Sequence, residues 1–170
     1  QEEELRQNIE EMQSVQEELE RQKAELDWEK HLMDTLLNNL PEYIYFKDKE
    51  SKFLKNSLSH TSLFGFSDPK DILGKSDFDF FTDEHARPAF EDEQKIIRTG
   101  KPIINLVEKE VKKDGTTTWV STSKMPLHDK QGKIIGTFGI SKAENCGAHS
   151  GAVSAGVDHG TKAPFESGFV

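Results

Sequence analysis

A seven-residue repeat of Leu and Met near the start of the chain constrains its fold more than any other feature. Every seventh residue is Leu or Met, at the positions Leu5, Met12, Leu19, Leu26, Met33 and Leu40. The same stretch has no Gly or Pro and is rich in Glu, Gln, Arg and Leu, which favour helix. A heptad kept over this length is typical of a coiled-coil seam, so we predict a dimerising helix over residues 1–40.

The second position of the seam is less apolar than the first. It reads Ile9, Gln16, Lys23, Lys30 and Leu37. Polar residues at a core position lower the stability of a coiled coil but fix its register, so we expect a marginal homodimer. A solvated single helix is the alternative, and the acidic run at residues 2–4 also fits it. We favour the dimer because all positions of the first row agree.

Charge separates this helix from the rest of the chain. The 170 residues hold 22 basic and 31 acidic side chains, a net charge of −9. Residues 1–30 hold 11 acids and four bases, whereas residues 31–142 hold 17 of each. Without a basic stripe or an apolar run of 18 residues, we expect neither a nucleic-acid partner nor a membrane span. The chain begins at Gln1 with a charged segment that does not resemble a signal peptide, and its one cysteine cannot form an internal disulfide. We therefore predict a cytoplasmic piece of a longer protein.

Residues 41–142 contain an ordered succession of strand and helix patterns. Pro41 ends the helix, because proline cannot continue its hydrogen bonds. Strands are expected at residues 43–46, 52–56, 103–112, 116–127 and 133–141, with short helices after residue 58 and a long amphipathic helix at residues 83–99. Asp114-Gly115 predicts a hairpin, and Ser76 begins a capping box. This order predicts an α+β fold, an antiparallel sheet with helices on one face.

Short motifs in this region, in this order, resemble those of bacterial PAS sensor domains. They lie at residues 40–48, 74–78, 80–81, 92–94, 99–102, 113–115, 119–120 and 134–141. The resemblance spans about residues 36–142, and it implies a five-stranded antiparallel sheet that encloses a small pocket with its helices. It also implies an output domain in the same polypeptide, such as a histidine kinase, diguanylate cyclase or other cyclase, or chemotaxis receptor. Residues 5–13 resemble the coiled linkers that precede such domains.

PAS domains often carry a cofactor, so the resemblance raises specific questions. Flavin photosensors of the family attach flavin through a cysteine early in the helical half, whereas Cys146 lies beyond the last expected strand. We therefore exclude flavin photochemistry. Haem-binding relatives use a histidine on the long helix, where His85 is the candidate. We expect His85 instead to be exposed beside Asp83 and Glu84 at the helix start, without haem, and leave the cofactor unknown.

No set of residues in the sequence supports a reaction. The glycines at positions 136 and 139 lie inside an expected strand and lack the lysine of a phosphate-binding loop. His128 and Asp129 are adjacent in a turn, without a nucleophile. Around Cys146 and His149 the spacing is not that of a known metal site. We therefore predict no catalytic residue, no metal site and a non-enzymatic module.

The pocket that the resemblance implies is the remaining candidate site. Its predicted ligand-binding residues are Asn56, His60, Phe64, Phe90, Trp119 and Ser121. Strand alternation places Ser121 and Ser123 on the same face as Trp119. If that face looks inward, the hydroxyls indicate a polar-tipped ligand or an ordered water. The alternatives are that the serines face solvent, and that the aromatic residues simply fill the core.

These patterns divide the chain into a coiled-coil helix (1–40), a sensor domain (41–142) and a tail (143–170). The tail has isolated apolar residues and no period, which predicts disorder or a non-native sequence. The leading hypothesis is a sensory and dimerisation module of a bacterial signalling protein, which relays a small-ligand or redox cue through the coil. The alternatives are a ligand-free scaffold for dimerisation or protein contacts and, ranked lowest, an enzyme fragment.

Overall fold

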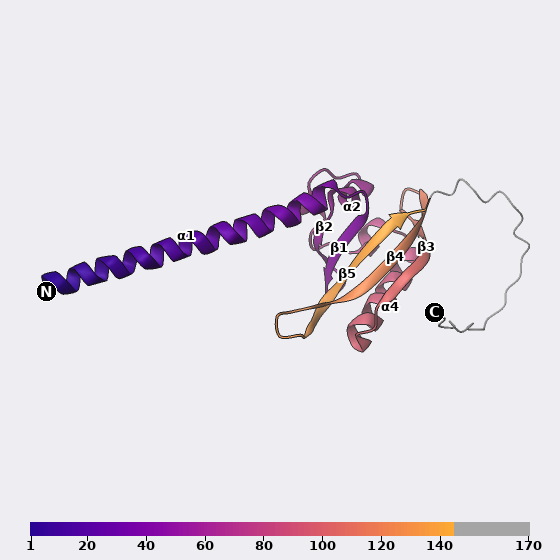
Figure 1. Cartoon of the computed structure of the whole chain (residues 1–170). Helices are drawn as coiled ribbons and strands as arrows, with labels where there is room; N and C mark the ends of the chain where they lie inside the picture. The colour runs from indigo at the N-terminus through magenta and orange to yellow at the C-terminus, as the bar shows by residue number, and fades with distance from the viewer. Residues whose placement is uncertain (145–170) are drawn as a thin grey trace, which may run out of the picture.

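Residues 1–144 are described in the computed structural model, and they form a long helix followed by an α+β domain (Figure 1). The elements in chain order are α1 (Glu2–Asn39), β1 (Tyr43–Asp48), β2 (Phe53–Asn56), α2 (Leu58–Leu63), the 3-10 helix η1 (Pro69–Ile72), α3 (Asp77–Phe80), α4 (Asp83–Thr99), β3 (Ile103–Val111), β4 (Thr117–His128) and β5 (Ile134–Ala143). The predictions for the tail beyond residue 144 lie outside the described residues.

The five strands form one antiparallel sheet in the order β2-β1-β5-β4-β3. The first and last strands in sequence, β1 and β5, therefore pair within the sheet, and the helices α2, η1, α3 and α4 come between β2 and β3 in the chain. Helix α4 packs against β3, β4 and β5, while α2 packs against β1. Figure 1 shows α4 lying across one face of the sheet. The predicted α+β fold is confirmed.

Local sequence signals explain where the helices begin and end. Ser76 and Asp79 form the predicted capping box at the start of α3, with Asp79 accepting from the Ser76 backbone N–H at 2.7 Å. Helix α4 has the bounds that the sequence predicts. It ends at Gly100, whose φ of 69° is the left-handed conformation that glycine adopts at low cost. Gly115, with φ 87°, likewise closes the predicted hairpin between β3 and β4.

Helix α1 is attached to the domain by its last two turns. Leu37 is buried, and Lys55 on β2 donates to Asp34 at 3.0 Å. Leu37 was predicted to lie in the second row of the coiled-coil seam, but the domain covers it instead, because α1 packs against α2. Leu40 is already extended, with ψ 137°, so α1 ends two residues before Pro41.

The rest of α1 projects away from the domain (Figure 1). Its apolar side chains are not covered by the domain. Along the heptad row, Leu5, Met12, Leu19 and Leu26 are 60–72% exposed. In residues 1–144 no helix is both long and apolar enough to cross a membrane.

Strand alternation fixes which side chains face the helices. On β4 the buried residues are Val120, Thr122 and Lys124, while Trp119 is 42% exposed. The inward interpretation of Trp119 and Ser121 is therefore wrong, and the alternative that turns this face outward is correct. A period of two shows which residues share a face of the strand, but it does not show which of the two faces is turned toward the core.

Candidate functional site: a charged cavity between sheet and helices

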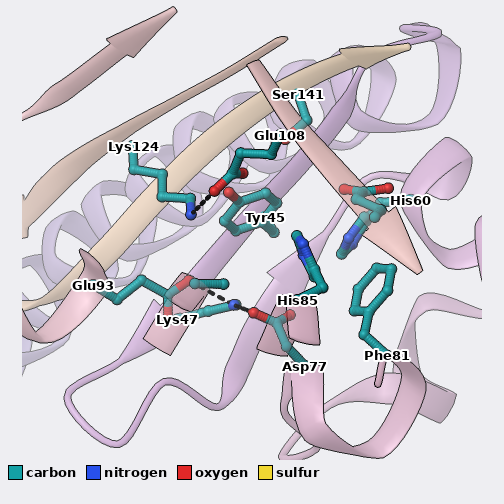
Figure 2. A pocket seen from close by; sticks show the side chains of 12 residues that line it. Tyr45, Lys47, His60, Asp77, Phe81, His85, Glu93, Glu108, Lys124 and Ser141 are labelled. Carbon is teal, nitrogen blue, oxygen red and sulfur yellow. Dashed lines mark hydrogen bonds and ion pairs between the residues drawn. The ribbon is translucent and has the colours of Figure 1, made fainter. Parts of the chain in front are cut away.

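A small cavity lies between the inner face of the sheet and helices α3 and α4. Its lining residues are Tyr45, Lys47, His60, Asp77, Phe81, His85, Ala89, Glu93, Glu108, Glu110, Lys124 and Ser141. They come from α2, α3, α4 and four of the five strands, so the complete domain is needed to assemble the site. Figure 2 shows these side chains converging from opposite sides.

Lys47 of β1 is the central cation of the site. Its Nζ donates to Asp77 Oδ2 on α3 and to Glu93 Oε1 on α4, at 2.6 Å each. The side chain is 2% exposed, and its Nζ also lies 4.8 Å from the ring centroid of Phe53 and 5.1 Å from that of Tyr45. One buried ammonium therefore joins the sheet to two helices through two charge-assisted hydrogen bonds (Figure 2). It also makes cation–π contacts with two aromatic rings of the sheet.

The charges in this triad are set by burial and by one another. Burial alone would lower the pKa of Lys47, but Asp77 and Glu93 outweigh it and leave that pKa raised. For Asp77, burial acts to raise the pKa, and the adjacent ammonium prevails and lowers it. The pKa of Glu93 is instead raised, by burial and by the negative charge of Asp77. Lys47 and Asp77 are therefore the firmly charged pair, and Glu93 is the member that takes up a proton first.

A second buried lysine lies on β4. Lys124 Nζ donates to Glu108 Oε1 on β3 at 3.1 Å and lies 3.8 Å from Asp92 Oδ2 on α4. Its side chain is only 3% exposed. Both lysines of the cavity thus have carboxylate partners, which compensate the cost of removing each ammonium from water.

His60 forms an aromatic wall of the cavity. Its Nδ1 lies 2.8 Å from Asn56 Oδ1, and because a carbonyl oxygen accepts, Nδ1 carries the hydrogen and Nε2 is left as an acceptor. The ring packs against Phe53 and Phe64, with centroid distances of 5.4 and 4.9 Å. Burial lowers the pKa of His60 to about 3, so the ring is neutral at physiological pH.

His85 lies in the first turn of α4, and its position corrects the sequence-based expectation. The side chain was expected in solvent beside Asp83 and Glu84, but it is 8% exposed and lines the cavity, with its ring 4.5 Å from that of Phe81. The reason is helical phase, since the buried Ala86 and Ala89 face the sheet from the same side of α4. Burial lowers the pKa of His85.

Glu110 of β3 differs from the other carboxylates of the site. It is 7% exposed, and its Oε2 atom is buried without a hydrogen-bond partner. Burial, with the negative charges of Asp77 and Glu108, raises the pKa of Glu110 to about 7. The lysines at positions 112 and 124 oppose this shift without cancelling it. Glu110 is therefore an incompletely satisfied acid that titrates near neutral pH.

The cavity is small and lined largely by polar groups. Its volume is about 20 Å³, which accommodates about one water molecule. Anything larger must move the lining side chains. Two lysines face four carboxylates there, and within residues 1–144 no group of three His, Cys, Asp or Glu side chains has the geometry to hold a metal ion.

The structure distributes the six predicted pocket residues among several environments. His60 lines the cavity, and Asn56 lies directly behind it. Phe64 is half-buried and stacks on Phe80 at 4.1 Å, outside the cavity lining. Phe90 packs against Phe78 beside a different hollow. The outer face of the sheet carries the remaining two, Trp119 and Ser121. A role in ligand binding stays a prediction for His60 and Asn56.

The charged residues of the site were missed by sequence analysis. Lys47 is in phase with Tyr45 on β1, and Lys124 is in phase with Val120 on β4. This period-two phase was the available signal. This signal is weak by itself, because lysine and glutamate usually face water and are buried only where opposite charges are paired.

Comparison with known proteins agrees with this architecture. A family model described as "PAS fold" matches residues 37–142, more than half of the chain. The chain belongs to the PAS family. The predicted family resemblance is thereby confirmed, and the cavity occupies the side of the sheet that faces the helices of the PAS domain.

Relatives of this PAS domain occur in larger proteins with different functions. A diguanylate cyclase of Vibrio cholerae is 27% identical over 111 residues, which cover 65% of this chain and 34% of that protein. VqmA bound to DPO is 27% identical, with a TM-score of 0.58 over 65% of this chain and 56% of VqmA. The Vibrio cholerae VqmA dimer, described without its target DNA, is 26% identical, with a TM-score of 0.59 over 65% and 49% of the two chains.

A more distant structure shows the fold alone. The PAS domain of an HTR-like protein from Haloarcula marismortui is 16% identical, with a TM-score of 0.54 over 74% of this chain and 99% of that domain. The matched part of this chain spans about a third of the diguanylate cyclase and about half of VqmA.

The buried triad generates a stability prediction. Replacing Lys47 with Met should lower the free energy of unfolding by about 3–5 kcal/mol, because Asp77 and Glu93 would stay buried without their cation. Lys55→Met on the neighbouring strand is the matched control: its partner Asp34 and its own side chain are each 42% exposed, so the loss should stay below about 1 kcal/mol. Urea unfolding measures both, and equal losses would contradict this account of the triad.

Glu110 generates a pH prediction. Its folded pKa of about 7 lies above the ordinary value of 4.5, so the folded protein binds more protons than the unfolded chain between these values. Glu110 therefore destabilises the fold progressively as pH rises from 4.5 through 7. The difference in unfolding free energy between the natural protein and Glu110→Gln should shift against the natural protein by about 2–3 kcal/mol from pH 5 to pH 8. Urea titrations at several pH values test this; a difference independent of pH would refute it.

Proposed function

We propose that this chain is a non-enzymatic sensory module, which binds a small polar ligand in the charged cavity and regulates an attached output domain. The observation that carries the proposal is the cavity itself, with its buried, incompletely hydrogen-bonded carboxylate at Glu110. A domain that served only as a scaffold would be more stable with apolar side chains there, because each buried ion costs several kcal/mol unless it is fully paired. The relatives support the proposal, since VqmA binds the ligand DPO.

The connection to an output runs through α1 in this proposal. The last turns of α1 are tied to the domain by Leu37 and by the Asp34–Lys55 ion pair, and Lys55 lies on β2, next to the strand that carries Lys47. A ligand that shifts β1 or the helices would thereby alter the direction or rotation of α1. Redox state is a second cue compatible with the same relay.

Dimerisation through α1 is the second part of the proposal. The heptad row is uncovered along most of the helix, with Leu19 60% and Leu26 66% exposed. Exposed apolar side chains at this spacing fit a second copy of the same helix. The homodimer would place two sensor domains at the same end of a coiled coil.

The output domain is proposed from the relatives. A diguanylate cyclase is the first candidate, because one such enzyme contains the matching segment. The second candidate is a DNA-binding domain, since a VqmA–ligand–DNA complex is also among the related structures, at 27% identity. In both cases the output domain, and not the sensor segment, would contact the substrate or the DNA. The sequence-based exclusion of nucleic acid therefore applies only to the sensor segment, which has no basic stripe.

The sensor proposal is tested by narrowing the cavity. A thermal-shift screen of small polar metabolites against the full chain should yield at least one stabilising compound, and Ala89→Val should abolish its effect, because Ala89 lines the cavity. Ala86→Val is the matched control, on the same face of α4 but outside the lining. If no compound stabilises the natural protein, or if the compound stabilises Ala89→Val and Ala86→Val equally, the ligand-free scaffold becomes the better account.

The dimer is tested by placing a charge in the heptad row. Leu19→Asp should weaken self-association at least tenfold in sedimentation equilibrium, because it places a carboxylate in the apolar seam. Ser14→Asp adds the same charge at a position outside both rows and should leave the dimer intact. A dimer of equal strength in the two variants would place the interface elsewhere.

A further inference from the structure

Among the residues that line the cavity, the two buried side-chain atoms without a hydrogen-bond partner are both carboxylate oxygens. Glu93 Oε2 and Glu110 Oε2 are buried and have no partner, on residues that are 1% and 7% exposed. His60 Nε2 is a third acceptor, since Nδ1 carries the ring hydrogen. By contrast, the two cationic donors are engaged, Lys47 by two carboxylates and Lys124 by Glu108. The lining carboxylates of Glu93 and Glu110 can therefore accept hydrogen bonds from a ligand.

The side chains that line the cavity include more acidic than basic groups. Four carboxylates and two ammonium groups line the cavity, and both histidines have lowered pKa values. An anionic ligand would add a further negative charge to this excess, while a cation would compensate it. The strongest partner for an unpaired buried carboxylate is a charged N–H group, because such a hydrogen bond is about twice as strong as a neutral one.

We infer that the ligand of this cavity is a small organic cation, an amine or amidine of a few heavy atoms, which donates N–H hydrogen bonds to the carboxylate of Glu110. This rests on the proposed sensory function and specifies its ligand class. The small volume of about 20 Å³ restricts the cationic head to a compact nitrogen group unless side chains move. Glu93 and His60 are the further acceptors for the same head.

Binding of a cation should be coupled to ionisation of Glu110. The titratable and charged groups that face it are Tyr43 on β1, Asp77 on α3, His85 on α4, Glu108 on β3, Lys112 directly after β3, and Lys124 on β4. Without ligand they leave Glu110 largely protonated below pH 7. A cation favours the ionised form, so the affinity should rise about tenfold between pH 6 and pH 8, and a proton should be released on binding.

Three small molecules of nearly the same shape test the effect of ligand charge on binding. Acetamidinium is cationic, acetamide is neutral and acetate is anionic, and each is titrated calorimetrically into the full chain at pH 8 and constant ionic strength. Acetamidinium should bind at least tenfold more tightly than acetamide, and acetate should not bind. Equal binding of acetamide, or preferential binding of acetate, overturns the cationic ligand while leaving the sensory function in place.

Two variants assign the interaction to one residue. Glu110→Gln keeps the shape but not the charge, and it should weaken acetamidinium binding at least tenfold. Glu91→Gln, at an exposed position of α4, should bind as the natural protein does. If Glu110→Gln fails to fold, calorimetry of the natural protein near pH 6.5 in two buffers of different ionisation enthalpy measures the released proton instead.

Each remaining outcome is also decisive. Unchanged binding by Glu110→Gln, or binding without proton release, excludes Glu110 as the partner of the cation. If none of the three molecules binds, the inference fails. The proposed sensory function is then judged separately by the metabolite screen and the Ala89→Val variant, which do not depend on the charge of the ligand.

Discussion

The contact of Lys47 with Asp77 and Glu93 is the interaction on which the arrangement of the domain depends. Apolar packing between sheet and helix tolerates small shifts, whereas two hydrogen bonds of 2.6 Å from one ammonium fix the distance and direction of three elements at once. α3 has four residues and cannot hold its position alone. The triad therefore acts as a polar core, and the cavity exists because charged side chains around it cannot close up as aliphatic ones do.

The sequence predicts the fold well because each local signal for a helix, strand or turn is consistent with the overall fold. Pro41, Gly100 and the Asp114-Gly115 turn each mark a boundary that the structure also has, and the bounds of α4 coincide with the predicted helix. Changes between a period of 3.6 and a period of two then identify the elements between these boundaries. Such signals are local, since they depend on backbone preferences of a few neighbouring residues.

The site is less predictable because it depends on pairs of residues far apart in sequence. Lys47 and Glu93 are 46 residues apart, and each alone is an ordinary surface residue by composition. Only the fold shows that each compensates the burial of the other. His85 illustrates the same limit: its acidic neighbours in sequence suggested solvent, while its phase on α4 directs it inward. Aromatic residues were in turn over-assigned to the pocket, since several of them serve packing elsewhere.

The junction of α1 with the domain has a mechanical consequence for the proposed relay. The 38 residues of α1 extend about 57 Å as one unbroken rod, and no loop intervenes before Leu37 enters the core. The helix is therefore a lever whose fulcrum is the Asp34–Lys55 contact. A tilt of about 5° at that fulcrum moves the far end by about 5 Å, close to the rise of one helical turn. In the proposed relay, leverage would amplify a sub-ångström rearrangement beside β2 into a displacement as large as a side chain.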